Sequence, residues 1–156
     1  MRERVLDVVQ VVPAPLERVF AFFADAANLE RLTPAFLRFA ILSPRPIQMR
    51  AGALIDYSIR LYGVPMRWRS RITVWEPGVR FVDEQVKGPY SLWVHEHTFE
   101  AVRDERGREA TRVRDVVRYA APVDWLSHGL FVRPNLERIF AFRRAGIERV
   151  FPAAAG

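Results

Sequence analysis

The sequence predicts an α+β fold in which one antiparallel sheet of seven strands is covered by a long C-terminal helix. Between residues 36 and 119, apolar and polar side chains alternate with a period of two in six successive segments. The stretch 135–151 then changes to the helical period. The 156 residues, half of them hydrophobic, correspond to one domain that is long enough to bury a core.

The first segments are expected to form one strand followed by two short helices. Residues 4–12 are rich in β-branched side chains, and Pro13 ends this strand because proline cannot donate to the ladder. Apolar side chains at helical spacing indicate a helix over residues 15–25, which begins at a proline. A second short helix is expected over residues 28–32, since Thr33 precedes a proline and therefore avoids the α region.

Six further strands and a long helix complete the predicted fold. Every gap between these strands carries glycine, proline or a charged turn, which is typical of a meander of antiparallel hairpins. In the helix over residues 135–151, Leu136, Phe140 and Ile147 share an apolar face that is expected to cover the sheet. The strands are expected at residues 36–42, 53–61, 66–75, 80–86, 91–102 and 110–119.

The alternation within the strands predicts a sheet with one face in water. In residues 66–75 one face carries Arg67, Arg69 and Arg71, and this row of arginines must face solvent. A second strand agrees, because it places Tyr57 on its inward face opposite charged residues. The inward face of residues 66–75 then carries Met66, Trp68, Ser70, Ile72 and Val74.

Polar side chains at such inward positions indicate a functional interior. His95 and His97 fall on an inward strand face, and Arg143 falls within about 20° of Leu136, in the middle of the apolar helix face. Burying an unpaired ion costs several kcal/mol. Either these groups pair with each other, or the interior is an apolar cavity with a few polar groups. The expected lining of that cavity is Phe23, Tyr57, Trp68, Phe81, Asp83, Gln85, Trp93, His95, His97, Phe99, Asp115 and Arg143.

Several roles are open for these inward polar residues. The α-carbons of His95 and His97 are expected roughly 6.7 Å apart. This spacing suits a structural or ligand-orienting pair, acid/base chemistry together with Asp83, or a metal with Asp83 or Asp115 as third ligand. We expect no metal and no cofactor. Arg143 either pairs with one of these carboxylates or meets an acidic ligand, and the inward aromatic residues are either core or ligand walls.

Composition and charge exclude several classes of protein. The chain has no cysteine, which excludes disulfides, thiolate nucleophiles and cysteine-held zinc. The net charge of +6 comes from scattered arginines rather than a basic run, so no nucleic-acid binding is expected. No apolar run approaches the roughly 18 residues of a membrane span, so we expect a cytoplasmic protein without integral membrane association. Neither a nucleophile elbow nor a glycine-rich phosphate loop is present.

Four residues of the connecting segments carry further expectations. Phe36 and Phe131 are candidates for the entrance to the cavity. Asp124 and His128 lie in the loop before the last helix and are expected to be solvated.

Seven short motifs share their residue pattern with one known family. They are Phe22-Phe23-Ala24-Asp25, Asn28-Leu29, Leu32-Thr33-Pro34, Phe81-Val82-Asp83-Glu84-Gln85, Gly88-Pro89-Tyr90, Trp93-Val94-His95-Glu96-His97-Thr98-Phe99 and Ile139-Phe140-Ala141-Phe142-Arg143. Together, from about Leu6 to Phe151, they resemble the ligand-binding SRPBCC domains, which are related to START domains and polyketide cyclases. The resemblance implies a helix-grip fold, in which a curved antiparallel sheet grips the C-terminal helix around a hydrophobic tunnel.

The resemblance also guides the expected function. Its members bind lipids, sterols, polyketides or plant hormones, and a minority catalyse cyclisation or dehydration. We therefore expect a carrier that binds a small hydrophobic or amphipathic ligand between sheet and helix. The alternative is a cyclase, aromatase or dehydratase acting on a polyketide-like substrate, with His95 and His97 as general acid and base. A homodimer is an open alternative to a monomer in either case.

Overall fold

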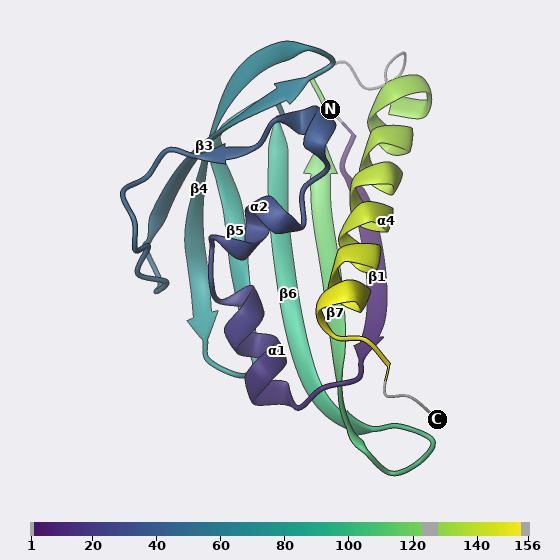
Figure 1. Ribbon diagram of the computed structural model, residues 1–156. Helices are drawn as coiled ribbons and strands as arrows, with labels where there is room; N and C mark the ends of the chain where they lie inside the picture. The colour runs from purple at the N-terminus through teal and green to yellow at the C-terminus, as the bar shows by residue number, and fades with distance from the viewer. Residues whose placement is uncertain (1, 123–127, 154–156) are drawn as a thin grey trace.

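The computed structural model describes residues 2–122 and 128–153, which form one seven-stranded sheet with helices against it (Figure 1). The strand order is β1-β7-β6-β5-β4-β3-β2, and every neighbouring pair is antiparallel. The strands are β1 (Arg4–Val12), β2 (Ala40–Ile41), β3 (Leu54–Leu61), β4 (Val64–Glu76), β5 (Arg80–Lys87), β6 (Leu92–Arg103) and β7 (Glu109–Ala120). The helices are α1 (Leu16–Phe23), α2 (Asn28–Arg31) and α4 (Arg133–Val150), with a 3-10 turn at Ala35–Leu37 and a π turn at His128–Val132. The predicted helix-grip architecture is confirmed.

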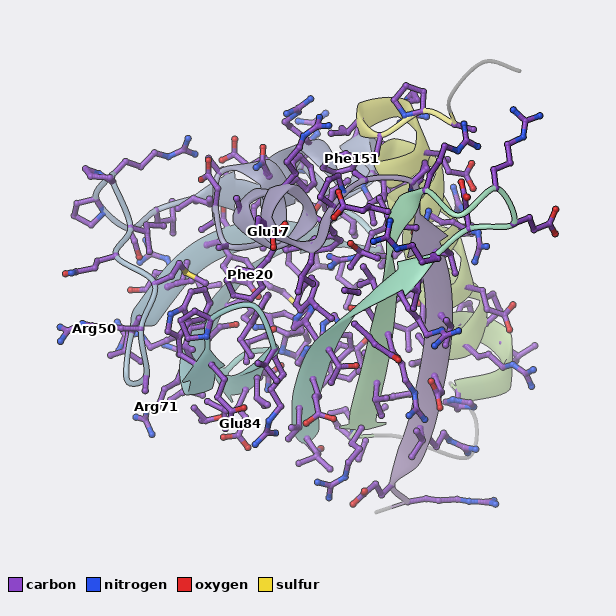
Figure 2. All side chains as sticks on the ribbon, turned by 90° about the horizontal axis from the view of Figure 1, so that it is seen from below. Glu17, Phe20, Arg50, Arg71, Glu84 and Phe151 are labelled. Carbon is purple, nitrogen blue, oxygen red and sulfur yellow. The ribbon has the colours of Figure 1, made fainter. Side chains whose placement is uncertain are left out.

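The helices α1, α2 and α4 lie on the same side of the sheet (Figure 1). The side-chain amide of Gln10 in β1 donates to the Arg144 carbonyl at 3.2 Å, which ties α4 to the sheet edge. Arg67, Arg69 and Arg71 are exposed, so the predicted wet face of the sheet is confirmed. Figure 2 shows Arg71 projecting away from the helices into solvent. Among residues 2–122 and 128–153, no helix combines the length and apolar character needed to cross a membrane.

An aromatic cluster packs α1 onto the sheet. Phe20 and Phe23 of α1 place their rings 5.1 Å and 5.4 Å from the Phe99 ring of β6, and Figure 2 shows Phe20 on the inner side of α1. Phe81 and Phe151 are buried in the same cluster. Each fully buried aromatic side chain contributes roughly 1.5–3 kcal/mol of transfer free energy. This cluster fills one end of the space under the helices.

The predicted strand over residues 36–42 is wrong in most of its length. The structure has the 3-10 turn Ala35–Leu37 there, and only Ala40–Ile41 forms a strand, paired with β3. Between the turn and the strand, Arg38 has a left-handed backbone with φ of 44°. A residue in that conformation interrupts an extended strand, and a period-two pattern of apolar residues does not reveal it.

An irregularity in β4 also corrects the predicted inward face. The register with β5 shifts between Ile72 and Val74, so strict alternation fails beyond this point. Trp75 rather than Val74 therefore packs into the interior, with its ring 5.5 Å from Phe20 and 5.4 Å from Phe81. An inserted residue in one strand moves the following side chains to the other face.

The segment before α4 is a π turn, and its first residue, His128, is buried rather than solvated. His128 is 9% exposed, and its Nε2 lies 2.9 Å from the hydroxyl of Tyr119, with the two rings stacked. The prediction of a solvated His128 is therefore wrong, because the π turn folds back against the end of β7. Asp124, for which the same was expected, lies outside the described residues.

Candidate functional site

A cavity of about 200 Å³ lies between the sheet and the helices α2 and α4. Most of its lining is apolar, and the polar groups are few, which is the usual composition of a small-molecule site. The residues predicted for the site that line this cavity are Phe23, Tyr57, Trp68, Phe81, Asp83, Trp93, His95, His97 and Arg143.

Three of the predicted residues lie outside the cavity lining. Gln85 uses its amide locally, because it donates to the Tyr90 carbonyl at 2.7 Å and accepts from the Tyr90 amide at 3.1 Å. Phe99 is buried in the cluster under α1. Asp115 contacts the two histidines and Arg143, so it acts on the cavity through these three side chains.

Other parts of the lining escaped the sequence interpretation. The short segment around α2 contributes Leu29 and Leu32, and α4 contributes Asn135 and Ile139. Helical periodicity marks Ile139 as inward, but it does not distinguish a residue that packs from one that faces a void. For α2, four residues are too short for a helical pattern to indicate a buried face.

The strand register brings two histidines and two aspartates together. Asp83 of β5 lies opposite His95 of β6, and His97 of β6 lies opposite Asp115 of β7. Because alternate residues of a strand point to the same face, all four side chains project toward the helices. The ring centroids of His95 and His97 are 3.7 Å apart, and the ring of Phe81 stacks on His97 at 4.1 Å.

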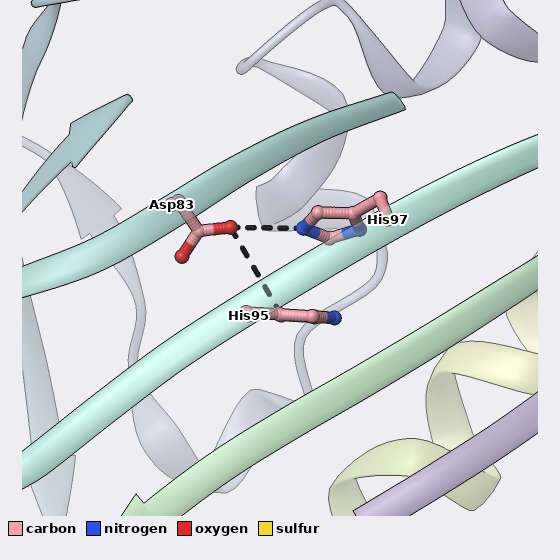
Figure 3. A group of neighbouring side chains, drawn as sticks. All are labelled: Asp83, His95 and His97. Carbon is pink, nitrogen blue, oxygen red and sulfur yellow. Dashed lines mark hydrogen bonds and ion pairs between the residues drawn. The ribbon is translucent and has the colours of Figure 1, made fainter. Parts of the chain in front are cut away.

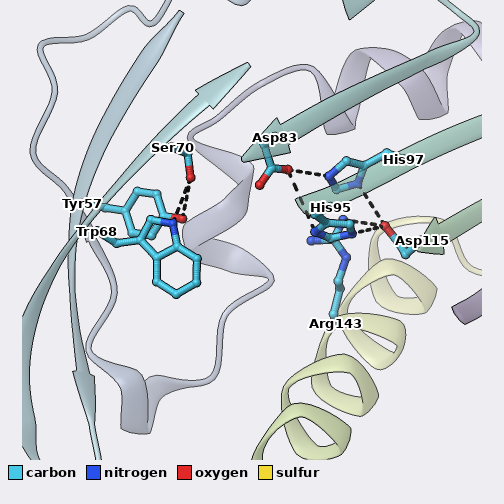
Figure 4. A network of polar contacts seen from close by, with 8 residues as sticks. All are labelled: Tyr57, Trp68, Ser70, Asp83, His95, His97, Asp115 and Arg143. Atoms are coloured by element: carbon cyan, nitrogen blue, oxygen red, sulfur yellow. Dashed lines mark hydrogen bonds and ion pairs between the residues drawn. The ribbon is translucent and has the colours of Figure 1, made fainter. Parts of the chain in front are cut away.

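The hydrogen bonds run diagonally between these opposed pairs (Figures 3 and 4). His97 Nε2 lies 2.8 Å from Asp83 Oδ2, and His95 Nε2 lies 2.8 Å from Asp115 Oδ1. His97 Nδ1 lies 2.9 Å from Asp115 Oδ1 but has no hydrogen bond there. Each histidine thus has a hydrogen bond with one carboxylate, and Asp115 Oδ1 lies within 2.9 Å of a nitrogen of both rings.

Arg143 reaches this group from α4 (Figure 4). Its side chain belongs to a residue that is only 8% exposed, and one terminal nitrogen lies 3.7 Å from Asp115 Oδ1. The guanidinium also lies over the Phe23 ring, 5.2 Å from its centroid. The sequence left open whether Arg143 pairs with a carboxylate of the protein or meets an acidic ligand. The structure contains the pair with Asp115, but its distance is too long for a hydrogen bond.

The environment shifts the pKa values of this group in opposite directions. Burial favours a neutral Asp115, but the Arg143 charge and the contacts with both histidines outweigh it and hold the pKa of Asp115 well below its usual value. Burial likewise opposes the ionised Asp83, yet the hydrogen bond from His97 lowers the pKa of Asp83 overall.

The pKa values of the two histidines are shifted in opposite directions. Burial lowers the pKa of both imidazoles. For His97, the contacts with Asp115 and Asp83 outweigh burial and raise its pKa. For His95, burial and the neighbouring His97 charge dominate, and its pKa falls. Within this group a proton is therefore favoured on His97 over His95, beside the carboxylates of Asp83 and Asp115.

A metal ion fits this arrangement poorly. One donor atom from each of Asp83, His95 and His97 lies within 4.8 Å of the others, which is close enough for a shared ion. However, His97 Nε2 is already hydrogen-bonded to Asp83, and the raised pKa of His97 favours a proton on its ring. A divalent cation would have to displace that proton and lie close to the positive charge of Arg143, which repels it.

A second, uncharged polar group lines another part of the cavity (Figure 4). Ser70 Oγ accepts a hydrogen bond from Trp68 Nε1 at 3.0 Å and shares another with the Tyr57 hydroxyl at 3.0 Å. Burial and the Asp83 charge raise the pKa of Tyr57 well above its usual value, so this phenol stays neutral. The indole and phenol rings stack with their centroids 5.8 Å apart.

Comparison with known proteins identifies the family. The family model described as polyketide cyclase/dehydrase and lipid transport matches residues 12–143, which is well over half of the chain. The protein therefore belongs to this family, and the resemblance inferred from its motifs is confirmed. A search of curated protein sequences finds no match.

Solved structures share the fold at low sequence identity. The chain is similar to the Zhui aromatase/cyclase from Streptomyces sp. R1128, with 16% identity, a TM-score of 0.72, and coverage of 99% of this chain and 100% of that chain. It is also similar to the ginseng major latex-like protein 151 from Panax ginseng, with 13% identity, a TM-score of 0.65, and coverage of 97% and 99% respectively. At such identities the likeness shows the helix-grip fold and not a shared ligand.

Proposed function

We propose that the protein binds a small hydrophobic or amphipathic molecule in the cavity between the sheet and α4. The observation that carries this proposal is the cavity of about 200 Å³, whose lining is apolar apart from a few converging polar groups. A structural interior without a ligand role would be expected to fill such a space with side chains, since protein cores pack to crystal-like density.

The cavity volume limits the size of the ligand. An apolar cavity of about 150 Å³ accommodates benzene, whereas pockets for drug-sized compounds have roughly 300–1,000 Å³. A cavity of about 200 Å³ therefore suits a compound of one or two rings. At about 0.3 kcal/mol per heavy atom, a ligand of about 15 heavy atoms binds with a Kd of roughly 0.5 mM, and good polar contacts tighten this toward the micromolar range.

The proposal is tested by filling the cavity with a larger side chain. Leu29, on α2, lines the cavity and is partly exposed, so Leu29→Trp is expected to fold while occluding the void. We expect the wild-type protein to enhance the fluorescence of the neutral two-ring dye 6-propionyl-2-(dimethylamino)naphthalene, and the variant to lose most of this signal. Leu130→Trp is the matched control, because Leu130 is 70% exposed and outside the cavity lining.

One outcome of the dye-binding experiment would contradict the proposal. If the two tryptophan variants and the wild type bind the dye equally, binding occurs elsewhere and the cavity proposal fails. Native mass spectrometry of freshly purified protein adds an independent test, since a co-purified small molecule is expected to be absent from the Leu29→Trp variant.

A second candidate function is acid/base catalysis on a bound substrate. The observation that favours it is that His95 and His97 both line the cavity and each is hydrogen-bonded to a carboxylate, which is an arrangement that orients a general acid or base. If this function is correct, a 1,5-diketone bound in the cavity cyclises: an enol carbon formed at one end attacks the carbonyl at the other end, and the resulting hydroxyl leaves as water. His95→Ala and His97→Ala are then expected to lose turnover but keep dye binding. Unchanged diketone after prolonged incubation with the wild-type protein contradicts it.

A further inference from the structure

The guanidinium of Arg143 is buried without the hydrogen bonds that such a group needs. Its Nε is fully buried and has no hydrogen-bond partner among the described residues. The nearest carboxylate oxygen, Asp115 Oδ1, is 3.7 Å from a terminal nitrogen of Arg143. The guanidinium also lies over the face of the Phe23 ring, which offers no hydrogen-bond acceptor of ordinary strength. A guanidinium carries five N–H donors, and leaving them unpaired in a protein interior is costly.

Asp115 is poorly placed to satisfy this guanidinium. Its Oδ1 already accepts a hydrogen bond from His95 Nε2 at 2.8 Å and lies 2.9 Å from His97 Nδ1. Moving closer to Arg143 would require this oxygen to leave the histidines, whose rings are fixed by stacking on each other and on Phe81. The missing acceptors for Arg143 must therefore come from the side of the cavity, which Arg143 lines.

The charges on the cavity side favour an anion. Arg143, His97 and Asp83 line the cavity, whereas the carboxylate of Asp115 lies behind the histidines and outside the lining. The guanidinium of Arg143 and the imidazole of His97, whose pKa is raised, thus face the void together with the carboxylate of Asp83. Electrostatic attraction in such a weakly polar space is much stronger than in water.

We propose that the ligand of the cavity is a small aromatic carboxylic acid, whose carboxylate accepts hydrogen bonds from Arg143 while its ring occupies the apolar part of the void. This inference rests on the proposed binding function and specifies its ligand class. The planar guanidinium matches a carboxylate through two parallel hydrogen bonds. The remaining apolar lining, including Trp68 and Trp93, supplies flat surfaces for the ring.

The test compares two probes that differ only in charge. The probes are 2-naphthoate and its amide 2-naphthamide, titrated at pH 7 by isothermal calorimetry and by displacement of 6-propionyl-2-(dimethylamino)naphthalene. A hydrogen-bonded charge pair changes affinity roughly tenfold to a hundredfold, so the wild-type protein is expected to bind the acid at least tenfold more tightly than the amide.

Variants of two adjacent arginines locate this preference. Arg143→Gln is expected to abolish the preference for the acid while leaving affinity for the amide within about threefold, and Arg143→Lys to keep part of it, because the lysine retains the charge but loses the paired geometry. The matched control is Arg144→Gln, since the side chain of Arg144 is exposed and pairs with Glu148 outside the cavity. The control is expected to keep the full preference.

The outcomes separate this inference from the binding function. Equal binding of acid and amide by the wild type, or displacement of the dye by the amide alone, overturns the carboxylate inference and leaves the cavity function standing. The same holds if Arg144→Gln lowers the preference as much as Arg143→Gln. Failure of the dye itself to bind overturns both. If Arg143→Gln does not fold, the wild-type comparison of acid with amide and the Arg143→Lys variant still decide the question.

Discussion

The two polar groups in the cavity wall differ in how completely they satisfy themselves. In the neutral group, the hydroxyl of Ser70 accepts a hydrogen bond from the Trp68 indole and shares another with the Tyr57 hydroxyl. All three side chains therefore have a hydrogen-bond partner. In the charged group, which consists of Asp83, His95, His97, Asp115 and Arg143, the Arg143 Nε and the His97 Nδ1 are buried and have no hydrogen-bond partner within residues 2–122 and 128–153. A polar group whose hydrogen bonds are all made fixes the positions of its side chains in the cavity wall. A polar group with unpaired donors can still form hydrogen bonds with a ligand.

The largest expected effect comes from removing the carboxylate at the centre of the charged group. Asp115→Ala leaves Arg143 without its buried counter-charge and removes one of the two carboxylates beside His97, and breaking such a buried pair costs roughly 3–5 kcal/mol. Urea unfolding is expected to show this loss. Asp7→Ala is the control, because Asp7 makes an exposed pair with Arg114, and such pairs contribute little.

This comparison has a definite way to fail. If Asp115→Ala and Asp7→Ala have the same urea midpoint, the charged group is not an interdependent buried network, and its difference from the neutral group disappears.

A smaller effect is expected in the neutral group. Ser70→Ala leaves the Trp68 Nε1 and the Tyr57 hydroxyl without their shared partner, at a cost of about 1–3 kcal/mol. The free energy of unfolding should fall by this amount, while the ratio of acid to amide affinity stays constant. Ser91→Ala, at an exposed position, is the matched control. A changed acid-to-amide ratio in Ser70→Ala would show that the neutral group also takes part in ligand recognition.

The smallest effect concerns the pH dependence of stability. The pKa of His97 is raised above its unfolded value of 6.5 by the two carboxylates, despite its burial. Its contribution to the free energy of unfolding is therefore fully present below about pH 6.5 and is lost as the pH rises through the folded pKa. His95 has a lowered pKa and acts in the opposite sense, since its contribution is lost as the pH falls below about 6.5.

Single variants separate these two contributions. His97→Gln is expected to be more destabilising, relative to wild type, at pH 6 than at pH 9, and His95→Gln is expected to show the reverse order. Urea unfolding at both pH values provides the measurement. The assignment of the proton to His97 is wrong if the two variants show the same pH dependence.

The sequence by itself determined the inward direction of most side chains of the site. Alternation along a strand is a local property of the backbone, so the inward direction of His95, His97 and Asp83 follows from the residues beside them. The helical period in the same way places Arg143 on the face of α4 that meets the sheet. The fold class followed from these periods and from the proline and glycine turns that separate them.

Only the tertiary structure decided how these groups pair and how much space remains. Strand register places Asp83 opposite His95, yet the hydrogen bonds run from His97 to Asp83 and from His95 to Asp115. The inward turn of Trp75, the burial of His128 and the unmet donors of Arg143 likewise depend on segments far apart in the chain. The cavity volume is a small difference between two large volumes, that of the space enclosed by sheet and helices and that of the side chains inside it. Local sequence patterns therefore do not predict it.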